Sequence, residues 1–130
     1  MDTIPADLFF ATVTPGTRFR AWPTTGRNVH AGLILTAVTP PTRNDDGDLY
    51  VPFAYPRWTN LGGGAVYRDN PDRYELVAAG AVDVCSCGEP GSIVPDPHLT
   101  ADGRHDTAAM LPVMLCPTCL VQVTALAHAD

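Results

Sequence analysis

The 130-residue sequence has no lysine and only four cysteines. Its eight basic residues are all arginines, and 14 acidic residues give a net charge of −6. An acidic balance disfavours nonspecific binding to nucleic acids and to anionic membranes, because both need a cationic surface. The sequence also contains 13 prolines and 11 glycines. Together with the absence of lysine, this composition indicates a high-GC genome or a phage of a high-GC host.

Long apolar segments are also missing. The longest apolar run, Ala108 to Leu115, has eight residues, whereas a helix that spans a bilayer needs about 20. No basic residue precedes Arg18, so the N-terminus lacks the charged start of a secretory signal. We therefore expect a cytoplasmic or virion location, no secretion by a signal peptide and no membrane partner. In a reducing compartment, paired cysteines bind metals more often than they form disulfides.

Length and charge distribution together predict two parts. A chain of 130 residues has room for one compact domain with a small appendage, but not for a second full-sized core. Residues 1–80 contain seven arginines and eight acids, for −1, whereas residues 81–130 contain one arginine and six acids, for −5. We predict a small β-barrel or sandwich domain in residues 1–80 and a zinc-binding segment in residues 81–130.

The four cysteines form two close pairs, Cys85-Ser86-Cys87 and Cys116-Pro117-Thr118-Cys119. Two such pairs supply the four soft thiolates that Zn²⁺ prefers in a tetrahedral structural site. The alternatives are two disulfides, four unrelated buried thiols, or an iron site resembling that of rubredoxin, because tetrahedral thiolates suit iron as well. The sequence favours one bound Zn²⁺, with the ligands Cys85, Cys87, Cys116 and Cys119.

Residues 1–80 contain short β-rich runs separated by turns, and they show no helical periodicity. The strongest turn signal is Asn44-Asp45-Asp46-Gly47-Asp48, which predicts a hairpin. Gly62-Gly63-Gly64 predicts a flexible loop that could bear an interaction surface. Five or six short strands at this spacing favour a mainly β fold, a small β-barrel that is SH3-like or similar. The predicted strands are Phe9–Thr14, Thr17–Trp22, Val29–Val38, Leu49–Phe53, Ala65–Arg68 and Arg73–Ala78.

The C-terminal part predicts a strand and a short helix around the second cysteine pair. Leu111–Leu115 suits a strand, whereas Pro117 suits the first turn of a helix that Leu120–His128 can continue. A cysteine knuckle, a loop or hairpin, and a second pair at a helix start resemble the treble-clef class of zinc fingers. The resemblance implies that the first pair forms the knuckle and that the second pair binds metal from the helix. The alternative is a zinc ribbon, because residues 121–124 also suit a strand.

A second resemblance has catalytic implications. Cys87-Gly88-Glu89, followed by the second cysteine pair, looks like the zinc-deaminase pattern. That resemblance implies three thiolates around an activated water, with Glu89 as the proton shuttle. The structural alternative for Glu89 is a solvated loop acid. His98 and His105 are candidate substitute ligands, whereas His30 and His128 suit the surface or a position behind the metal ligands.

Aromatic residues alternate with arginines in residues 18–74, a pattern that could form a stacking surface for nucleic acid. The stronger interpretation is that the aromatics build the core and that the arginines lie on the solvent face. The aromatic residues concerned are Phe19, Trp22, Tyr50, Phe53, Tyr55, Trp58, Tyr67 and Tyr74.

These observations predict a non-enzymatic, zinc-stabilised protein-interaction or structural subunit of a larger assembly, such as the virion of a phage of a high-GC host. The expected partners are other protein subunits, in a homo- or hetero-oligomer. The candidate docking residues Ile93, Val94 and Leu99 lie in the loop Gly88–Arg104, whose prolines and glycines exclude a long helix. The alternative functions are a zinc-finger regulator that binds nucleic acid and, third, a zinc-dependent deaminase.

Overall fold

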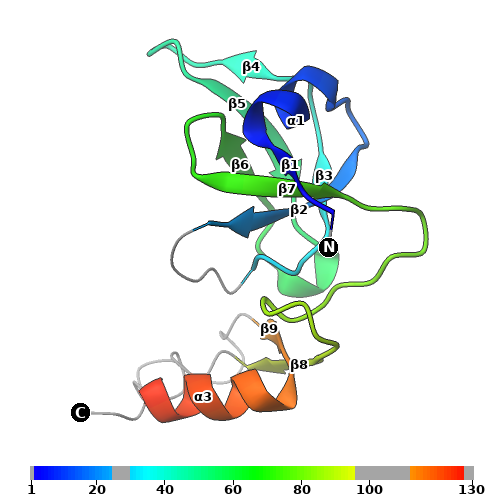
Figure 1. The fold of residues 1–130 in the computed structure, drawn as a ribbon, viewed down its shortest axis with the longest axis vertical. Helices are drawn as coiled ribbons and strands as arrows, with labels where there is room; N and C mark the ends of the chain where they lie inside the picture. The colour runs from blue at the N-terminus through cyan, green and yellow to red at the C-terminus, as the bar shows by residue number, and fades with distance from the viewer. Residues whose placement is uncertain (1, 25–29, 96–111, 128–130) are drawn as a thin grey trace.

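The computed structural model describes residues 2–24, 30–95 and 112–127. These residues form two layers, which Figure 1 shows one above the other. The larger layer is a curled antiparallel sheet of seven strands with a short helix, and we call it the half-barrel. The smaller, which we call the C-terminal layer, is a two-stranded sheet with the second helix and the cysteine turn before it.

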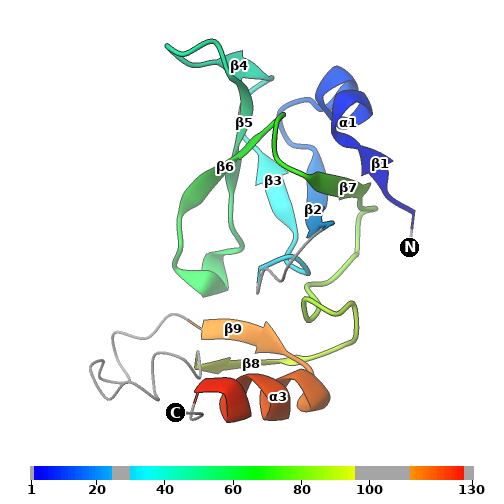
Figure 2. The same ribbon diagram turned by 60° about the vertical axis from the view of Figure 1, so that its left-hand side comes forward.

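The half-barrel sheet has the strand order β1-β7-β2-β3-β5-β4, and β6 pairs with the other side of β5. Within the described residues no ladder joins β6 to β7, so the sheet stays open between these two strands (Figure 2). The prediction of a mainly β fold is confirmed, as a half-barrel. Its strands are β1 Ile4–Pro5, β2 Arg18–Pro23, β3 Leu35–Ala37, β4 Thr42–Arg43, β5 Leu49–Ala54, β6 Gly63–Tyr67 and β7 Asp72–Leu76.

The strand predicted at Phe9–Thr14 is wrong, because this region forms helix α1, Ala6–Thr12. Phe9 and Phe10 are consecutive and both buried, which a strand with one face on the core does not allow. The Phe9 ring stacks on Tyr74 at a centroid distance of 4.1 Å. Aromatic residues favour strands locally, but here a helix lets both rings reach the core. The expectation of no helical segment in residues 1–80 is therefore also wrong.

The long strand predicted at Val29–Val38 is much shorter in the structure. Within the described part of this range, residues 30–38, only Leu35–Ala37, β3, is a strand, and residues 30–33 form a turn; Val29 lies outside the described residues. All five residues from Ala31 to Leu35 are buried, in place of the predicted alternation. At Gly32, an added Cβ would lie 2.2 Å from the carbonyl oxygen of Val84. This segment is therefore covered by a later part of the chain, which local patterning does not reveal.

The predicted hairpin at residues 44–48 is confirmed as the connection between β4 and β5. The Asn44 side-chain oxygen accepts hydrogen bonds from the amides of Asp46 and Asp48, and Gly47 adopts a left-handed φ of +84°. The predicted loop at residues 62–64 is partly wrong, since β6 begins at Gly63. A Cβ at Gly64 would lie 2.8 Å from the ring of Phe53, so glycine lets this ring pack against the backbone of β6.

The core of the half-barrel lies between the curled sheet and α1. Phe9, Phe19 and Tyr74 are fully buried at its centre, and Met114 from the C-terminal layer reaches into the same cluster. The remaining buried members of the cluster are Phe10, Val13, Leu33, Leu35, Ala37, Val51, Phe53 and Val66.

The C-terminal layer consists of β8 Ser92–Pro95, β9 Pro112–Leu115 and α3 Pro117–Ala127. β8 and β9 are antiparallel, with Ile93 opposite Met114. The predicted strand at Leu111–Leu115 is confirmed for Pro112–Leu115, and the predicted helix is confirmed, with Pro117 in its first turn as expected. The strand alternative for residues 121–124 is wrong. Between the two cysteine pairs, where a loop or hairpin was expected, β8 pairs antiparallel with β9. Leu99, His98 and His105 lie outside the described residues.

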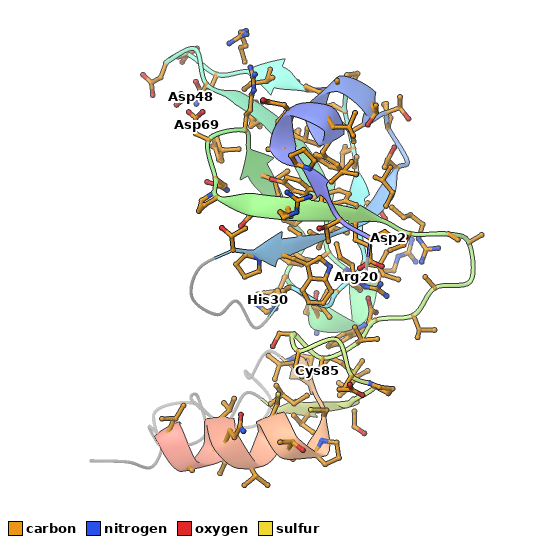
Figure 3. All side chains as sticks on the ribbon, in the orientation of Figure 1. Asp2, Arg20, His30, Asp48, Asp69 and Cys85 are labelled. Atoms are coloured by element: carbon orange, nitrogen blue, oxygen red, sulfur yellow. The ribbon has the colours of Figure 1, made fainter. Side chains whose placement is uncertain are left out.

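The segment Val82–Cys85, which we call the strap, connects the two layers. Arg20 Nε donates to the carbonyl of Gly32 at 3.1 Å, and Arg20 also donates to the carbonyl of Val82. Its third contact is an ion pair with Glu75 at 3.0 Å. Arg20 is only 8 % exposed, so the expectation that the arginines lie on the solvent face is wrong for this one. Figure 3 shows Arg20 at the end of the half-barrel that faces Cys85.

Asp83 fastens the strap to two other parts of the half-barrel. One carboxylate oxygen accepts from the Ile34 amide at 2.7 Å and the other from the Trp58 indole at 2.8 Å. Both hydrogen bonds involve a charged acceptor, which makes them stronger than bonds between neutral groups. Asp83 therefore joins the strap to the turn before β3 and to the 3₁₀ helix η1, Arg57–Thr59.

We expect Asp83→Ala to lower the free energy of unfolding by about 1.5–3 kcal/mol, because it leaves a buried amide and an indole N–H without their acceptor. Chemical denaturation followed by Trp58 fluorescence measures the loss. Asp69→Ala is the matched control, since Asp69 is an exposed acid in the turn before β7. Equal stabilities of the two variants would contradict the role of Asp83.

Candidate metal centre

The first cysteine pair lies in a tight turn that the backbone closes on both sides. The amide of Gly88 donates to the carbonyl of Cys85 at 2.8 Å, and the amide of Cys85 donates to the carbonyl of Glu89 at 3.0 Å. Gly88 has a φ of +92°, a left-handed conformation that glycine adopts without strain. This turn brings Cys85 and Cys87 to the same side although only one residue separates them.

The second pair lies where β9 ends and α3 begins. The Cys119 amide donates to Cys116 Sγ at 3.4 Å, and the Leu120 amide donates to the carbonyl of Cys116 at 2.9 Å. Pro117 occupies the first helical position, where its missing N–H leaves no hydrogen bond unmade. The helix start therefore turns both sulfurs toward the first pair.

The four sulfur atoms of Cys85, Cys87, Cys116 and Cys119 form one cluster, all within 4.8 Å of one another. Cys87 Sγ and Cys116 Sγ are 3.6 Å apart. A tetrahedron of Zn–S bonds of about 2.3 Å places its sulfurs about 3.8 Å apart, so this spacing fits a metal ion at the centre. All four cysteines are free, and the disulfide alternative is therefore wrong. The alternative of four unrelated thiols is wrong as well.

Burial differs across the cluster. Cys85, Cys116 and Cys119 are buried, whereas Cys87 is exposed. Small apolar side chains pack behind the sulfurs, and an added Cβ at Gly91 would lie 2.6 Å from the backbone of Leu115. The close approach at Gly91 lets the cysteine turn lie directly on the end of β9. The apolar residues around the cluster are Val94, Val113, Leu115, Leu120 and Val123.

The surroundings of Cys85 favour the thiolate that a metal needs. Burial by itself raises the pKa of this thiol, but hydrogen bonds from the backbones of Cys87 and Cys116 and from the thiols of Cys119 and Cys87 lower the pKa to about 6. The pKa of the Cys87 thiol is raised. A hydrogen bond with the backbone of Glu89 lowers this pKa, but desolvation and the neighbouring sulfurs of Cys116 and Cys85 raise it by more. One cysteine is thus prepared as a thiolate before a metal binds.

These four thiols fit a divalent soft metal, and Zn²⁺ is the ion that such a set most often holds. The donor set alone does not distinguish zinc from iron. Glu89 follows a turn, and its side chain is exposed. Its backbone carbonyl accepts the hydrogen bond from the Cys85 amide that closes the cysteine turn. His30 lies in the half-barrel, where its ring contacts Tyr55, and His128 lies outside the described residues.

The four cysteines of the cluster were predicted from the sequence, whereas the residues that position them were not. Arg20, Gly32, Trp58 and Asp83 hold the strap that leads into Cys85. None of them has a local pattern that links it to cysteines, because their partners lie many residues away. The one available signal was Arg20, because an arginine between two hydrophobic residues of a strand indicates a buried charge with a partner.

Comparison of the chain with protein-family models, with curated proteins and with solved structures gives no match. Among the described residues, no helix has the length and apolar character needed to cross a membrane. The chemistry of the site therefore has to be inferred from its own residues and their surroundings.

Proposed function

We propose that this chain is a non-catalytic protein-interaction module, a structural subunit of a larger assembly, whose C-terminal layer folds around one Zn²⁺. The supporting observation is the surface of α3. The helix Pro117–Ala127 contains no charged residue, yet Val121 and Leu126 are 70 % and 69 % exposed. Surface helices of a monomer normally carry charged side chains on the outward face. An apolar outward face indicates a surface that another protein covers.

The neighbouring strand extends this apolar character. Ile93 on β8 is 52 % exposed, and Val82 on the strap is 69 % exposed. Val94, by contrast, packs partly buried against the cysteine cluster and so belongs to the layer's interior. Of the three docking residues predicted from sequence, Ile93 is therefore the one available to a partner among the described residues.

A structural metal supports the non-catalytic part of the proposal. A catalytic zinc keeps one coordination position open for water, whereas a structural zinc has four protein ligands. Here Cys85 joins the other three cysteines in one cluster, so all four positions have a sulfur. The deaminase interpretation needs one position for water and a glutamate near it, and Glu89 is exposed. The knuckle and the helix that carry the two pairs support a treble-clef-like arrangement.

Cobalt substitution tests this assignment directly. We expect Co²⁺-loaded protein to show the absorption of tetrahedral four-thiolate cobalt, and we expect added cyanide or azide to leave that spectrum unchanged. Cys85→Ser opens a position and serves as the positive control. A wild-type spectrum that changes with these anions would contradict a closed structural site.

The interaction role is tested with tagged copies of the chain recovered from their native cells. We expect the wild type to co-purify with a stoichiometric protein subunit and Val121→Asp to lose most of that subunit. Gln122→Asp is the matched control, because Gln122 is also exposed on α3 and its replacement adds the same charge. A zinc-loaded wild type that sediments as a lone monomer from these cells would contradict the proposal. The virion setting stays a prediction from composition.

The alternative function, nucleic-acid binding, has little support from the described side chains. Phe19, Phe53 and Tyr74 are core residues rather than exposed stacking platforms, as the structural interpretation predicted. Arg20 is buried, and Arg68 is paired with Asp7. We expect affinity for DNA or RNA no better than about 10⁻⁴ to 10⁻⁶ M at physiological salt, the range of nonspecific binding. Fluorescence anisotropy with labelled oligonucleotides measures it, and tight sequence-selective binding would reverse this ranking.

A further inference from the structure

A small cavity opens along the seam where β6 and β7 do not pair. It has a volume of about 120 Å³, enough for a group of a few heavy atoms and too small for a drug-sized ligand. Aliphatic side chains from β2, β3 and β6 line part of it. The side chains that give it chemical character are His30, Phe53, Tyr55, Asn70 and Asp72. The cavity is separate from the cysteine cluster.

Three of these side chains form aromatic walls that meet at angles. Phe53 and Tyr55 lie edge to face, with centroids 4.9 Å apart and ring planes at 83°. His30 and Tyr55 are 5.5 Å apart with ring planes at 65°. Rings at steep angles present faces as well as edges to the space between them, and an aromatic face attracts a cation through its quadrupole.

Asp72 adds a carboxylate to the same cavity. The described residues give this carboxylate no hydrogen bond and no ion pair, and burial raises its pKa. The neighbouring Tyr74, fully buried, also has a hydroxyl without a hydrogen-bond partner. Burial, and then the charge of Asp72, raise the pKa of Tyr74, so the hydroxyl lies within electrostatic range of the carboxylate. The half-buried carboxylate of Asp72 thus lies in the cavity without a cationic partner among the described residues, and a ligand that supplies a positive charge would stabilise its ionised form.

We propose that this cavity binds the alkylated ammonium head group of an organic cation, with Asp72 as its counter-ion and with Tyr55, Phe53 and His30 as its aromatic walls. An alkylated ammonium suits the site better than a metal ion, because only one carboxylate is present and the walls are aromatic. It also suits the site better than a primary ammonium, whose three N–H donors need acceptors. The head group can belong to a free small molecule or to a methylated lysine side chain.

The test is an NMR titration of the zinc-loaded full chain with tetramethylammonium chloride, against sodium chloride at equal ionic strength. We expect the signals of Tyr55, Phe53 and Asp72 to shift and saturate with tetramethylammonium only. Choline is then compared with 3,3-dimethylbutan-1-ol, which has nearly the same shape without the charge. We expect the alcohol to bind at least about tenfold more weakly, because neither the rings nor the carboxylate attract a neutral group electrostatically.

Two variants and one control locate the binding. Asp72→Asn keeps the shape of the side chain and is expected to weaken choline binding by about tenfold or more. Tyr55→Leu removes one aromatic wall and is expected to weaken it by several-fold. Asp48→Asn removes the same charge from an exposed loop at the far end of the half-barrel (Figure 3) and should change nothing. Thermal unfolding of each variant verifies that the half-barrel is intact.

The source of the head group follows from a third comparison. A peptide with a trimethyllysine that binds at least tenfold more tightly than choline identifies a modified protein segment, because the unpaired edge of β6 adds backbone contacts. Equal affinities identify a free small molecule. Equal binding of choline and the neutral alcohol, or an absence of shifts at Tyr55 and Asp72 with saturating tetramethylammonium, overturns the proposal.

Discussion

Replacing Cys119 with serine, or removing the metal with a chelator, is expected to unfold the C-terminal layer while the half-barrel keeps its core. Among the described residues, the cluster around the cysteines has only six buried members. Three are cysteines and three are aliphatic residues: Cys85, Cys116, Cys119, Val113, Leu115 and Val123. A core of this size provides little stability alone. A structural zinc ion can supply an apparent free energy of about 10–16 kcal/mol, comparable to the whole stability of a domain, about 5–15 kcal/mol.

The half-barrel is expected to survive because its core is made almost entirely by residues from Phe9 to Tyr74. Met114 is the one member of that core that comes from the C-terminal layer. Its loss from the cluster should lower the stability of the half-barrel without unfolding it. The expected NMR spectrum of Cys119→Ser therefore has native dispersion for the half-barrel and collapsed signals for the residues after the strap.

Elemental analysis of the purified protein should find one zinc per chain, and the Cys119→Ser protein should have lost it. Thr118→Ala is the matched control, since Thr118 is exposed between the two cysteines of the second pair. It should keep both the zinc and the wild-type spectrum. A wild type without metal, or a C-terminal layer that stays folded after complete chelation, would show that zinc does not fold this layer.

The second large effect is expected at Arg20, where Arg20→Met should lower the free energy of unfolding by about 3–5 kcal/mol. The substitution retains an unbranched apolar stem but removes the guanidinium from three acceptors. These are the Glu75 carboxylate and the carbonyls of Gly32 and Val82. Of these, the Gly32 carbonyl keeps only the Val84 amide and the Glu75 carboxylate only the Trp22 indole. The side chains of Arg20 and Glu75 are only 10 % and 21 % exposed, so water replaces these contacts poorly.

For a chain of this length, the loss corresponds to a fall in Tm of roughly 10–20 °C. Differential scanning calorimetry of the zinc-loaded protein measures it. Arg57→Met is the matched control, because Arg57 is exposed on η1 and its replacement should cost almost nothing. Adding Glu75→Gln to both the wild type and Arg20→Met separates the ion pair from the two carbonyl contacts. A loss below about 1 kcal/mol for Arg20→Met would contradict a buried role.

Together, these two predictions describe a protein in which a metal folds one layer and a buried arginine joins that layer to the other. Arg20 and Gly32 bind the strap at Val82 and Val84, and Asp83 within the strap accepts a hydrogen bond from the Ile34 amide. The position of the first cysteine pair therefore depends on the half-barrel.

Sequence reasoning located some elements correctly because their signals are local. The Asn44–Asp48 turn has its own side-chain hydrogen bonds, and Pro117 with Cys119 marks a helix start. The cluster of four cysteines that could hold a metal ion was also predictable, since two close cysteine pairs have few other uses in a chain without disulfides. The errors at Phe9–Thr14 and Val29–Val38 have a common cause. In both segments, the side chains pack against residues from distant parts of the chain. The local sequence pattern therefore does not show which of these side chains are buried.

The amino-acid sequence by itself determined the mainly β character of residues 1–80, the hairpin at residues 44–48 and the two cysteine pairs of the candidate metal centre, because turn chemistry and thiolate chemistry act over a few residues. Only the tertiary structure decided that Arg20 is buried, that Gly32 lies beneath the strap, and that Asp72 faces an aromatic cavity. These placements depend on pairings such as Arg20 with Glu75, 55 residues apart. Such contacts form only when the whole sheet has assembled, and no local pattern encodes them.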